Sequence, residues 1–517
     1  MKDLDRERNP ISSKRLILRN SFFLVFSNIV AIIIGLYASR VLLEKLGIED
    51  YGSYHVVGGI VVMFNSIQIL FTNSIQRFLN YYKSEKQKQN EIFNAGIQVQ
   101  QMMTVAFFVL TETIGIYAFL HLNLNDEKFV DAHIVYQLSV ATAIVSMLSV
   151  PYDALILANE RMKFYAWFSI IGKIFYLAII YIISIGPFSN IVNYAVLVFF
   201  VSILLRLIVV IYCKRHFDES KIHRIQNKSL IAKMVKFAGW NFLGQTGLYV
   251  SHQGVDFILN LTGGVAVNAA RSLTYSILNG VNALVGNASM AFKPQTNAAA
   301  AESRKKVFYS LLGYNAKTAF VCYLLLIVPI LIFAKQLICL WLGGVPNYVI
   351  EFLLAISPYY LLRSLHELVN QFFISIGEMK WYQIIEICTM AFIVPSAWLM
   401  LRNNYPFWTV FICMTLFETV NHIGTVWLGV MKNAFPLRYF LKDVYLPFAI
   451  MAAIAFSLVY GAYMLGLNNS RCLSEMIIGG LSIELLVITS AVYIVLNKQE
   501  RQFLVSYITS RLSNSGV

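Results

Sequence analysis

Apolar runs of about twenty residues recur along the whole 517-residue sequence, and each is long enough to cross a bilayer as an α-helix. Hydrophobic residues make up 58% of the chain and charged residues only 13%, which is more apolar than the core of a soluble protein requires. The sequence therefore predicts an all-α polytopic membrane protein.

About fourteen such runs meet the length criterion. Their centres lie near residues 31, 63, 108, 145, 175, 202, 249, 280, 325, 362, 391, 419, 455 and 486. With a cytoplasmic N-terminus, about thirty of the 41 Lys and Arg residues fall in cytoplasmic segments, as the positive-inside rule requires. We therefore expect both termini in the cytoplasm.

The most basic connection, KRHFDESKIHRIQNKSLIAKMVK at 214–236, separates two groups of helices. We predict an N-terminal lobe of six helices over 1–213, this segment as a cytoplasmic linker, a C-terminal lobe of six helices over 237–432, and two additional helices with a cytoplasmic tail over 433–517. GLYAS in the first helix recurs as GLYVS in the seventh. Two similar lobes that enter the membrane in the same sense are expected to surround a central cavity.

Several functional classes are disfavoured by the sequence. The excess of 14 positive charges lies mostly between the apolar runs, so it fits a membrane topology and not nucleic acid binding. The six cysteines lack CxxC spacing, and the sequence contains no Gly-rich phosphate loop, HExxH or GxSxG motif. We therefore expect no catalytic residues, metal site or cofactor.

Polar residues interrupt the tenth run in LLRSLHELVNQFF at 361–373. Ionisable side chains at bilayer depth are costly and usually face a bundle interior or a hydrated cavity. The spacing i, i+3, i+4, i+7 and i+8 places five polar residues on one helical face, namely Arg363, His366, Glu367, Asn370 and Gln371. The alternative is structural, because Arg363 and Glu367 could form an (i, i+4) ion pair.

The seventh run carries a similar stripe, formed by Asn241, Gln245, His252, Asp256 and Asn260. Two striped helices in one lobe predict the wall of a hydrated cavity. Among the acidic residues, Asp256, Glu367 and Glu418 are candidates for coupling to a proton or Na⁺.

Arg271, near the outer end of the eighth run, has no acidic residue within four positions, so it could bind an anion or extend to the headgroups. Arg40, at the outer end of the first run, could do the same or pair with Glu44. Arg206 and Lys317 lie near the cytoplasmic surface and are interpreted as structural.

Three stretches resemble a known family: ASRVLLEKLGIEDYGSYHVVGGIV, SIQRFLNYY and VPYDALILANERMKFYAWFSIIGKI. They are similar to bacterial polysaccharide-repeat-unit flippases of the Wzx type, in the multidrug/oligosaccharidyl-lipid/polysaccharide (MOP) exporter superfamily. The resemblance implies a non-enzymatic transporter of the bacterial inner membrane that serves O-antigen, lipopolysaccharide, capsule or exopolysaccharide synthesis. It would move an undecaprenyl-pyrophosphate-linked oligosaccharide to the outer leaflet by alternating access.

The resemblance also implies roles for individual residues. Arg40 and Arg271, with Arg77 and Arg363, would bind the pyrophosphate or an acidic sugar. The glycan would contact Asn241, Gln245, His252, Asn370 and Gln371, and His366 is a further candidate for substrate binding. Implied partners are the lipid-linked oligosaccharide, a proton or Na⁺ counter-ion, membrane lipids and polysaccharide polymerase machinery. The related peptidoglycan-precursor flippases carry charge early in helix one, whereas residues 21–39 here have none, which argues against that substrate.

Two other functions are weighed against this one. A multidrug cation antiporter of the same superfamily would need acidic residues in its N-terminal lobe, and the first helix has none. A membrane polysaccharide polymerase or ligase typically carries a large outer loop, whereas the external connections here do not exceed about twenty residues.

Overall fold

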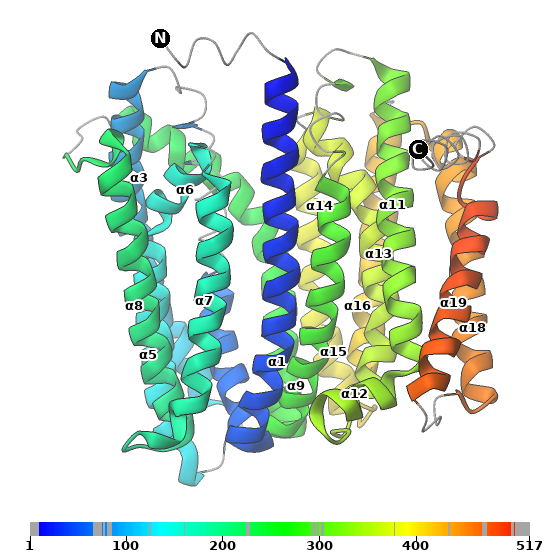
Figure 1. Cartoon of the computed structure of the whole chain (residues 1–517), viewed down its shortest axis with the longest axis horizontal. Helices are drawn as coiled ribbons and strands as arrows, with labels where there is room; N and C mark the ends of the chain where they lie inside the picture. The colour runs from blue at the N-terminus through cyan, green and yellow to red at the C-terminus, as the bar shows by residue number, and fades with distance from the viewer. Residues whose placement is uncertain are drawn as a thin grey trace, which may run out of the picture. The chain divides into compact units, whose positions relative to one another are not determined.

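The computed structural model is almost entirely helical (Figure 1). It describes residues 10–65, 75, 78–79, 85–122, 124, 126–159, 161–223, 228–290, 292, 296, 299–300, 304–376, 378–432, 435–467, 473–497 and 501. Every regular element in these ranges is a helix. The predicted all-α class, with about fourteen helices, is confirmed.

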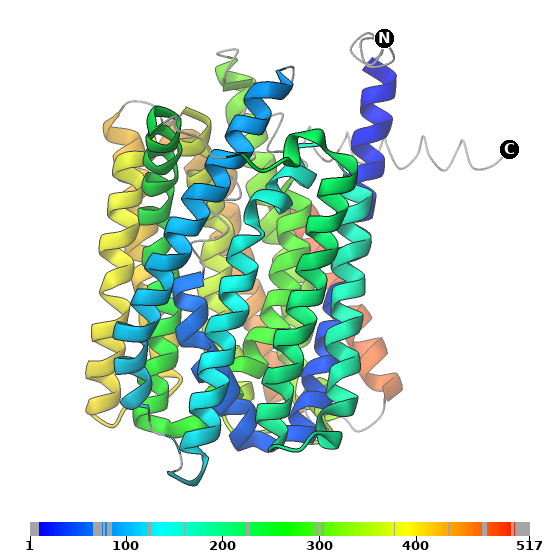
Figure 2. The same ribbon diagram turned by 90° about the vertical axis from the view of Figure 1, so that its left-hand side faces the viewer.

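The chain packs as two compact units, and unit 1 comprises residues 1–276 and 390–407. Its helices are α1 (Pro10–Asn65), α3 (Lys86–Leu110), η1 (Thr111–Gly115), α4 (Ile116–Leu120), η2 (Asp126–Lys128), α5 (Phe129–Leu148), α6 (Val150–Ala158), α7 (Met162–Ile182), η3 (Ile183–Ile185), α8 (Asn190–His216), η4 (Asp218–Ser220), most of α9 (Lys228–Met290), and α15 (Ile393–Arg402). Within unit 1, α5 packs on α3 and α8, and α7 packs on α1 and α8, so these long helices run alongside one another (Figure 2).

Unit 2 comprises residues 277–389 and 408–517. Its helices are α11 (Lys305–Ile332), α12 (Ala334–Leu342), α13 (Val349–Ile376), most of α14 (Met379–Ala391), α16 (Thr409–Met431), α17 (Leu437–Phe440), η5 (Leu441–Tyr445), α18 (Leu446–Met464) and α19 (Leu473–Ile494). Here α13 packs between α11 and α16, and α11 also contacts α18 and α19. The lobes predicted from sequence stay a prediction; the expected linker at 214–236 overlaps the end of α8 and the start of α9.

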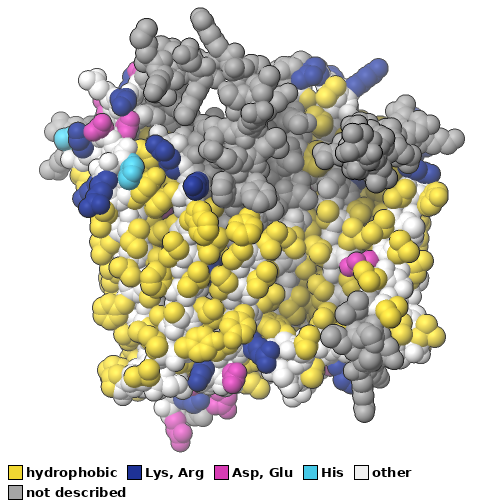
Figure 3. Space-filling model, in the orientation of Figure 1, with side chains coloured by type: hydrophobic (Ala, Val, Ile, Leu, Met, Phe, Trp, Pro, Cys, Tyr) yellow, Lys and Arg dark blue, Asp and Glu magenta, His cyan; other side chains and the backbone are white. Residues whose placement is uncertain are grey.

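Eight helices among the described residues are long and apolar enough to cross a membrane. They are Lys86–Leu120, Phe129–Ala158, Lys163–Ile185, Asn190–His216, Lys305–Ile332, Met379–Arg402, Thr409–Met431 and Leu437–Met464. Over α7 and α8, Figure 3 shows mainly hydrophobic side chains along the helices, with Lys and Arg side chains gathered at the end that is uppermost in the figure. Phe200 and Leu207 are among the large exposed apolar residues there, which is the surface that lipid requires.

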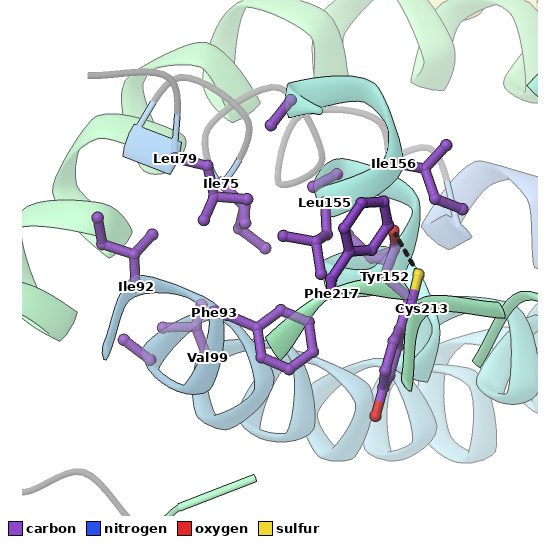
Figure 4. Packing of buried hydrophobic residues seen from close by; sticks show 14 of the residues in the cluster. Ile75, Leu79, Ile92, Phe93, Val99, Tyr152, Leu155, Ile156, Cys213 and Phe217 are labelled. Carbon is purple, nitrogen blue, oxygen red and sulfur yellow. Dashed lines mark hydrogen bonds between the residues drawn. The ribbon is translucent and has the colours of Figure 1, made fainter. Parts of the chain in front are cut away.

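A cluster of buried apolar side chains joins α3, α6 and the end of α8 (Figure 4). Phe93 and Tyr152 meet edge to face with ring centroids 5.1 Å apart, a favoured geometry for aromatic pairs. The buried Cys213 thiol donates to the carbonyl oxygen of Tyr152 over 3.6 Å, so this cysteine fills the core as a small, weakly polar residue. The cluster anchors α3 to α8.

Two glycines break long helices in the same way. Gly47 in α1 has φ 77° and ψ 172°, and Gly264 in α9 has φ 70° and ψ −173°. This region of backbone conformation is essentially restricted to glycine. The break at Gly47 separates the first predicted helix from the second, and the break at Gly264 separates the seventh from the eighth. The backbone at these two positions therefore supports the repeat seen in GLYAS and GLYVS.

We expect Gly264→Ala to lower the free energy of unfolding by about 1–3 kcal/mol, because alanine at this φ and ψ is strained. Gly35→Ala is the matched control, since Gly35 is helical and a Cβ there meets nothing within 4 Å. Thermal unfolding of the purified protein in detergent measures both changes. Equal unfolding temperatures for the two variants would show that the turn tolerates a side chain.

Candidate functional site: buried ion pairs and an apolar cavity

The break at Gly264 folds α9 back on itself and brings Arg271 beside Asp256. The two side chains form an ion pair, and Arg271 is only 2% exposed. Its Nη2 atom also donates to the carbonyl oxygen of His252 over 2.9 Å and to Tyr275 Oη over 3.1 Å. The guanidinium lies over the Tyr275 ring, 4.6 Å from its centroid, which adds a cation–π contact.

This geometry corrects the sequence expectation for Arg271. No acidic residue lies within four positions of Arg271 in the sequence, and its partner Asp256 lies on the other side of the kink. Arg271 is also too deeply buried to extend to the headgroups. Asn268 donates to the backbone oxygen of Asp256 over 2.8 Å, which further ties the two segments together.

Asp256 also lines a cavity of about 430 Å³ within unit 1. The walls come from α1, η1, α4, α9, α14 and α15 and are mostly apolar, with Ile60, Phe257 and Val394 among them. Ser251 and Gln253 are the other polar lining side chains, and Gln253 Oε1 is buried without a hydrogen-bond partner among the described residues. Such a cavity has the size of a small-molecule pocket, with one carboxylate at its wall.

A second buried ionic cluster lies in unit 2. Arg363 Nη2 is 2.9 Å from Glu386 Oε1, and its Nη1 is 3.3 Å from Glu418 Oε1. The two carboxylates come from α14 and α16 and are 6% and 0% exposed. One guanidinium therefore holds two buried carboxylates together.

The sequence suggested Glu367 as an (i, i+4) partner for Arg363, but Glu367 has a different contact. Glu367 accepts a hydrogen bond from Asn370 Nδ2 over 3.0 Å, one turn along the same helix. The carboxylates that Arg363 contacts belong to other helices. The polar stripe does share one face of α13, but its residues have different partners. Arg363 contacts carboxylates of α14 and α16, whereas Glu367 and Asn370 contact each other.

Two histidines and two tyrosines continue this cluster. His366 Nε2 is 2.7 Å from Tyr382 Oη, and His366 Nδ1 is 3.3 Å from His422 Nδ1. His422 Nε2 is 3.0 Å from Tyr445 Oη. His366 Nδ1 also lies 3.9 Å from Glu418 Oε1, so the rings and the ionic cluster adjoin each other.

The remaining sequence-predicted residues are placed as follows. Arg40 is half-buried in α1, and Gln371 is buried in α13, where its Nε2 donates to Ser375 Oγ over 3.3 Å. Arg77 lies outside the described residues. Asn241 and Gln245 belong to α9, but their side chains also lie outside the described part of the structure.

The structure thus brings together His252, Asp256 and Arg271 in unit 1, and Arg363, His366 and Glu418 in unit 2. Sequence reasoning missed three partners, Tyr275, Tyr382 and Glu386. Tyr382 and Glu386 lie four positions apart in an apolar run. The same helical periodicity identified the polar stripe of α13, so it could also have identified these two residues.

Three further ion pairs hold helices together. Arg206 contacts Asp153 at 2.9 Å and Lys317 contacts Asp443 at 3.0 Å, in agreement with structural roles for both cations. Near the kink of α1, Lys128 Nζ lies 2.7 Å from Asp50 Oδ1. The hydrogen bond to Asp50 raises the pKa of Lys128, with a smaller contribution from Glu49.

Comparison with known proteins gives a fold but no sequence relative. No family model matches the sequence, and no curated protein matches it. The structure resembles an inward-facing multidrug resistance MATE family transporter of the MOP superfamily, with a TM-score of 0.66, 16% identity, and 78% of this chain and 98% of that chain covered.

Two other solved structures are also similar. One is the lipid II flippase MurJ in an inward closed conformation, with a TM-score of 0.66, 13% identity, and 92% of this chain and 98% of that chain covered. The other is a MOP superfamily transporter from Pyrococcus furiosus, with a TM-score of 0.59, 15% identity, and 80% and 95% covered. The chain thus has the fold of MOP superfamily transporters and is a multi-pass membrane protein.

Proposed function

We propose that this protein is a flippase for a lipid-linked oligosaccharide. The substrate is an undecaprenyl-pyrophosphate-linked repeat unit of an O-antigen, capsule or exopolysaccharide, carried across the bacterial inner membrane by alternating access and without chemical change. Both termini would lie in the cytoplasm. A proton or Na⁺ as counter-ion, and contact with polysaccharide polymerase machinery, belong to the same proposal.

The observation that carries the proposal is the extent of the structural likeness. The lipid II flippase covers 92% of the chain, whereas the MATE transporter covers 78% and leaves about a fifth without a counterpart. The helices α17, η5, α18 and α19 occupy residues 437–494, after the two lobes that the sequence predicts. The two TM-scores are equal, but the flippase covers more of this chain, and this wider coverage supports a large lipid-linked substrate over a small cation.

The assignment of substrate contacts also stays a proposal. The geometry favours Arg271, in unit 1, over Arg363, in unit 2. Arg271 lies behind Asp256 at the wall of a cavity, so a pyrophosphate or acidic sugar could replace the carboxylate as its partner. Arg363 already contacts two carboxylates, so an anionic headgroup would have to compete with both. Arg271 is therefore the stronger candidate for a headgroup contact.

A multidrug cation antiporter is the second candidate, and the cavity favours it. The space of about 430 Å³ is lined mostly by apolar side chains and carries the Asp256 carboxylate. This combination suits an amphipathic organic cation, which would compete with Arg271 for the Asp256 carboxylate.

The test uses purified protein in liposomes that contain a fluorescent undecaprenyl-pyrophosphate oligosaccharide in both leaflets. An enzyme that degrades the headgroup is added outside, and the inner-leaflet pool is followed over time. We expect the inner pool to become accessible much faster with protein than in protein-free liposomes. Protection of the inner pool with several different glycans, together with uptake of organic cations, would instead support the antiporter.

A further inference from the structure

The contacts of His366 and His422 form one continuous hydrogen-bonded chain in unit 2. Its order is Tyr382 Oη, His366, His422 and Tyr445 Oη, joined by contacts of 2.7, 3.3 and 3.0 Å. Tyr382 is 1% exposed, whereas Tyr445 is half-buried. The chain therefore leads from a half-buried tyrosine to one deep within the helices.

The contact between His366 and His422 limits the protons of the chain to two arrangements. Two imidazole nitrogens can share a hydrogen bond only if one carries a proton and the other does not. In one neutral arrangement Tyr382 donates to His366 Nε2, His366 Nδ1 donates to His422 Nδ1, and His422 Nε2 donates to Tyr445. In the other, every donor and acceptor along the chain is exchanged. In both, one ring carries its proton on Nδ1 and the other on Nε2.

The two arrangements differ by the movement of one proton across each hydrogen bond. When the first converts into the second, one proton is taken up at the Tyr382 hydroxyl and one is released at the Tyr445 hydroxyl. The reverse conversion carries a proton from Tyr445 to Tyr382. Proton number is conserved in each direction when the adjoining Glu386 and Glu418 carboxylates exchange the proton at Tyr382 and solvent exchanges the proton at Tyr445.

The charge around the chain favours an additional proton. With both rings neutral, Arg363 is opposed by Glu386 and Glu418, so the buried cluster carries one excess negative charge. The titratable or charged groups that face the cluster are Tyr359, Arg363, His366 and Glu367 of α13, Tyr382 and Glu386 of α14, Glu418 and His422 of α16, and Tyr445 of η5.

We propose that Tyr445, His422, His366 and Tyr382 form a proton-transfer chain, and that the adjoining Arg363–Glu386–Glu418 cluster takes up one proton and so becomes neutral. His366 is then part of this chain and not a contact for the glycan. The use of the chain to drive export rests on the proposed function, whereas the chain itself does not.

The first test detects the bond between the rings. The protein is labelled with ¹⁵N-histidine, placed in lipid bilayers at mildly alkaline pH, and studied by solid-state NMR for a coupling between two imidazole nitrogens across a hydrogen bond. We expect one coupled pair, with one ring protonated on Nδ1 and the other on Nε2. His366→Gln and His422→Gln should each abolish the coupling.

His121→Gln is the matched control. His121 is exposed, and its Nδ1 atom donates to the carbonyl oxygen of Tyr117 over 2.8 Å, so it also contributes a ring protonated on Nδ1. Its removal should delete one such signal and leave the coupling intact. Wild-type protein with no nitrogen–nitrogen coupling, or with the same tautomer in both rings, would overturn the chain.

The second test asks whether proton transfer along the chain is coupled to flipping. Flipping is measured in the liposome assay with and without a pH gradient, and the response to the gradient should disappear in His366→Gln and His422→Gln. A response that persists in both variants would overturn the transfer role. If the wild type flips no substrate, the proposed function fails, while the NMR result still decides whether the chain exists.

Discussion

Replacing Arg363 with alanine is expected to destabilise the protein by about 3–5 kcal/mol, the usual consequence of removing one partner of a buried ion pair. The substitution leaves Glu386 and Glu418 buried, close together and without their shared cation. Both the desolvation of each carboxylate and the repulsion between them then oppose folding. The effect is measured as a shift of the thermal unfolding curve in detergent, followed by tryptophan fluorescence.

Two further variants separate the charge from the loss of the side chain. Arg363→Ala combined with Glu386→Gln and Glu418→Gln removes the buried charge, and it should recover most of the stability. Arg402→Ala is the control for loss of an arginine as such, because Arg402 is exposed and lies 5.0 Å from the centroid of the Trp398 ring. It should change stability by no more than about 1 kcal/mol, the contribution of an exposed cation–π contact. If Arg363→Ala unfolds at the wild-type temperature, the cluster is hydrated and its charges are solvated.

The helices could be predicted because their signal is local. An apolar run of sufficient length specifies a membrane helix by itself, so the all-α class and the approximate helix count followed from the sequence. The polar stripe of α13 likewise follows from the periodicity of one helix. Arg363 and His366 were correctly placed on one face, and that face is where Glu418 and His422 meet them.

The partners could not be predicted because they depend on packing between helices. Periodicity tells which residues share a face but not which neighbouring helix covers it, so Glu386 was missed. The partner of Arg271 could not be predicted for the same reason, although it lies on the same helix. Its partner Asp256 precedes it on α9, and the two meet only because Gly264 turns the chain at a φ of 70°. The substrate contacts assigned from the sequence remain predictions.

Replacing both Arg271 and Asp256 is expected to slow flipping strongly in a protein that still folds. If Arg271 binds the anionic headgroup, its loss removes a charge-assisted contact of about 1.5–3 kcal/mol, or roughly 10–100-fold in rate. Arg271→Ala alone would be ambiguous, because it also leaves the half-buried Asp256 carboxylate without its partner. Arg271→Ala with Asp256→Asn removes that penalty and isolates the contribution to transport.

Two single variants complete the comparison. Asp256→Asn should retain flipping and bind substrate more tightly, because the headgroup no longer competes with a carboxylate for Arg271. Arg271→Lys should retain part of the rate, because lysine keeps the charge but loses the planar fork that binds phosphate in two places. Rates come from the liposome assay, and folding from the thermal unfolding temperature of each variant.

The combination of outcomes decides between a transport role and a structural one. If the double variant folds like the wild type and flips at the wild-type rate, the Arg271–Asp256 pair serves only to close the turn at Gly264, and the headgroup must be bound elsewhere. If it folds normally and flips no substrate while Asp256→Asn remains active, the requirement is for the guanidinium itself. A role confined to the ion pair cannot give that second pattern, because Asp256→Asn breaks the pair as well.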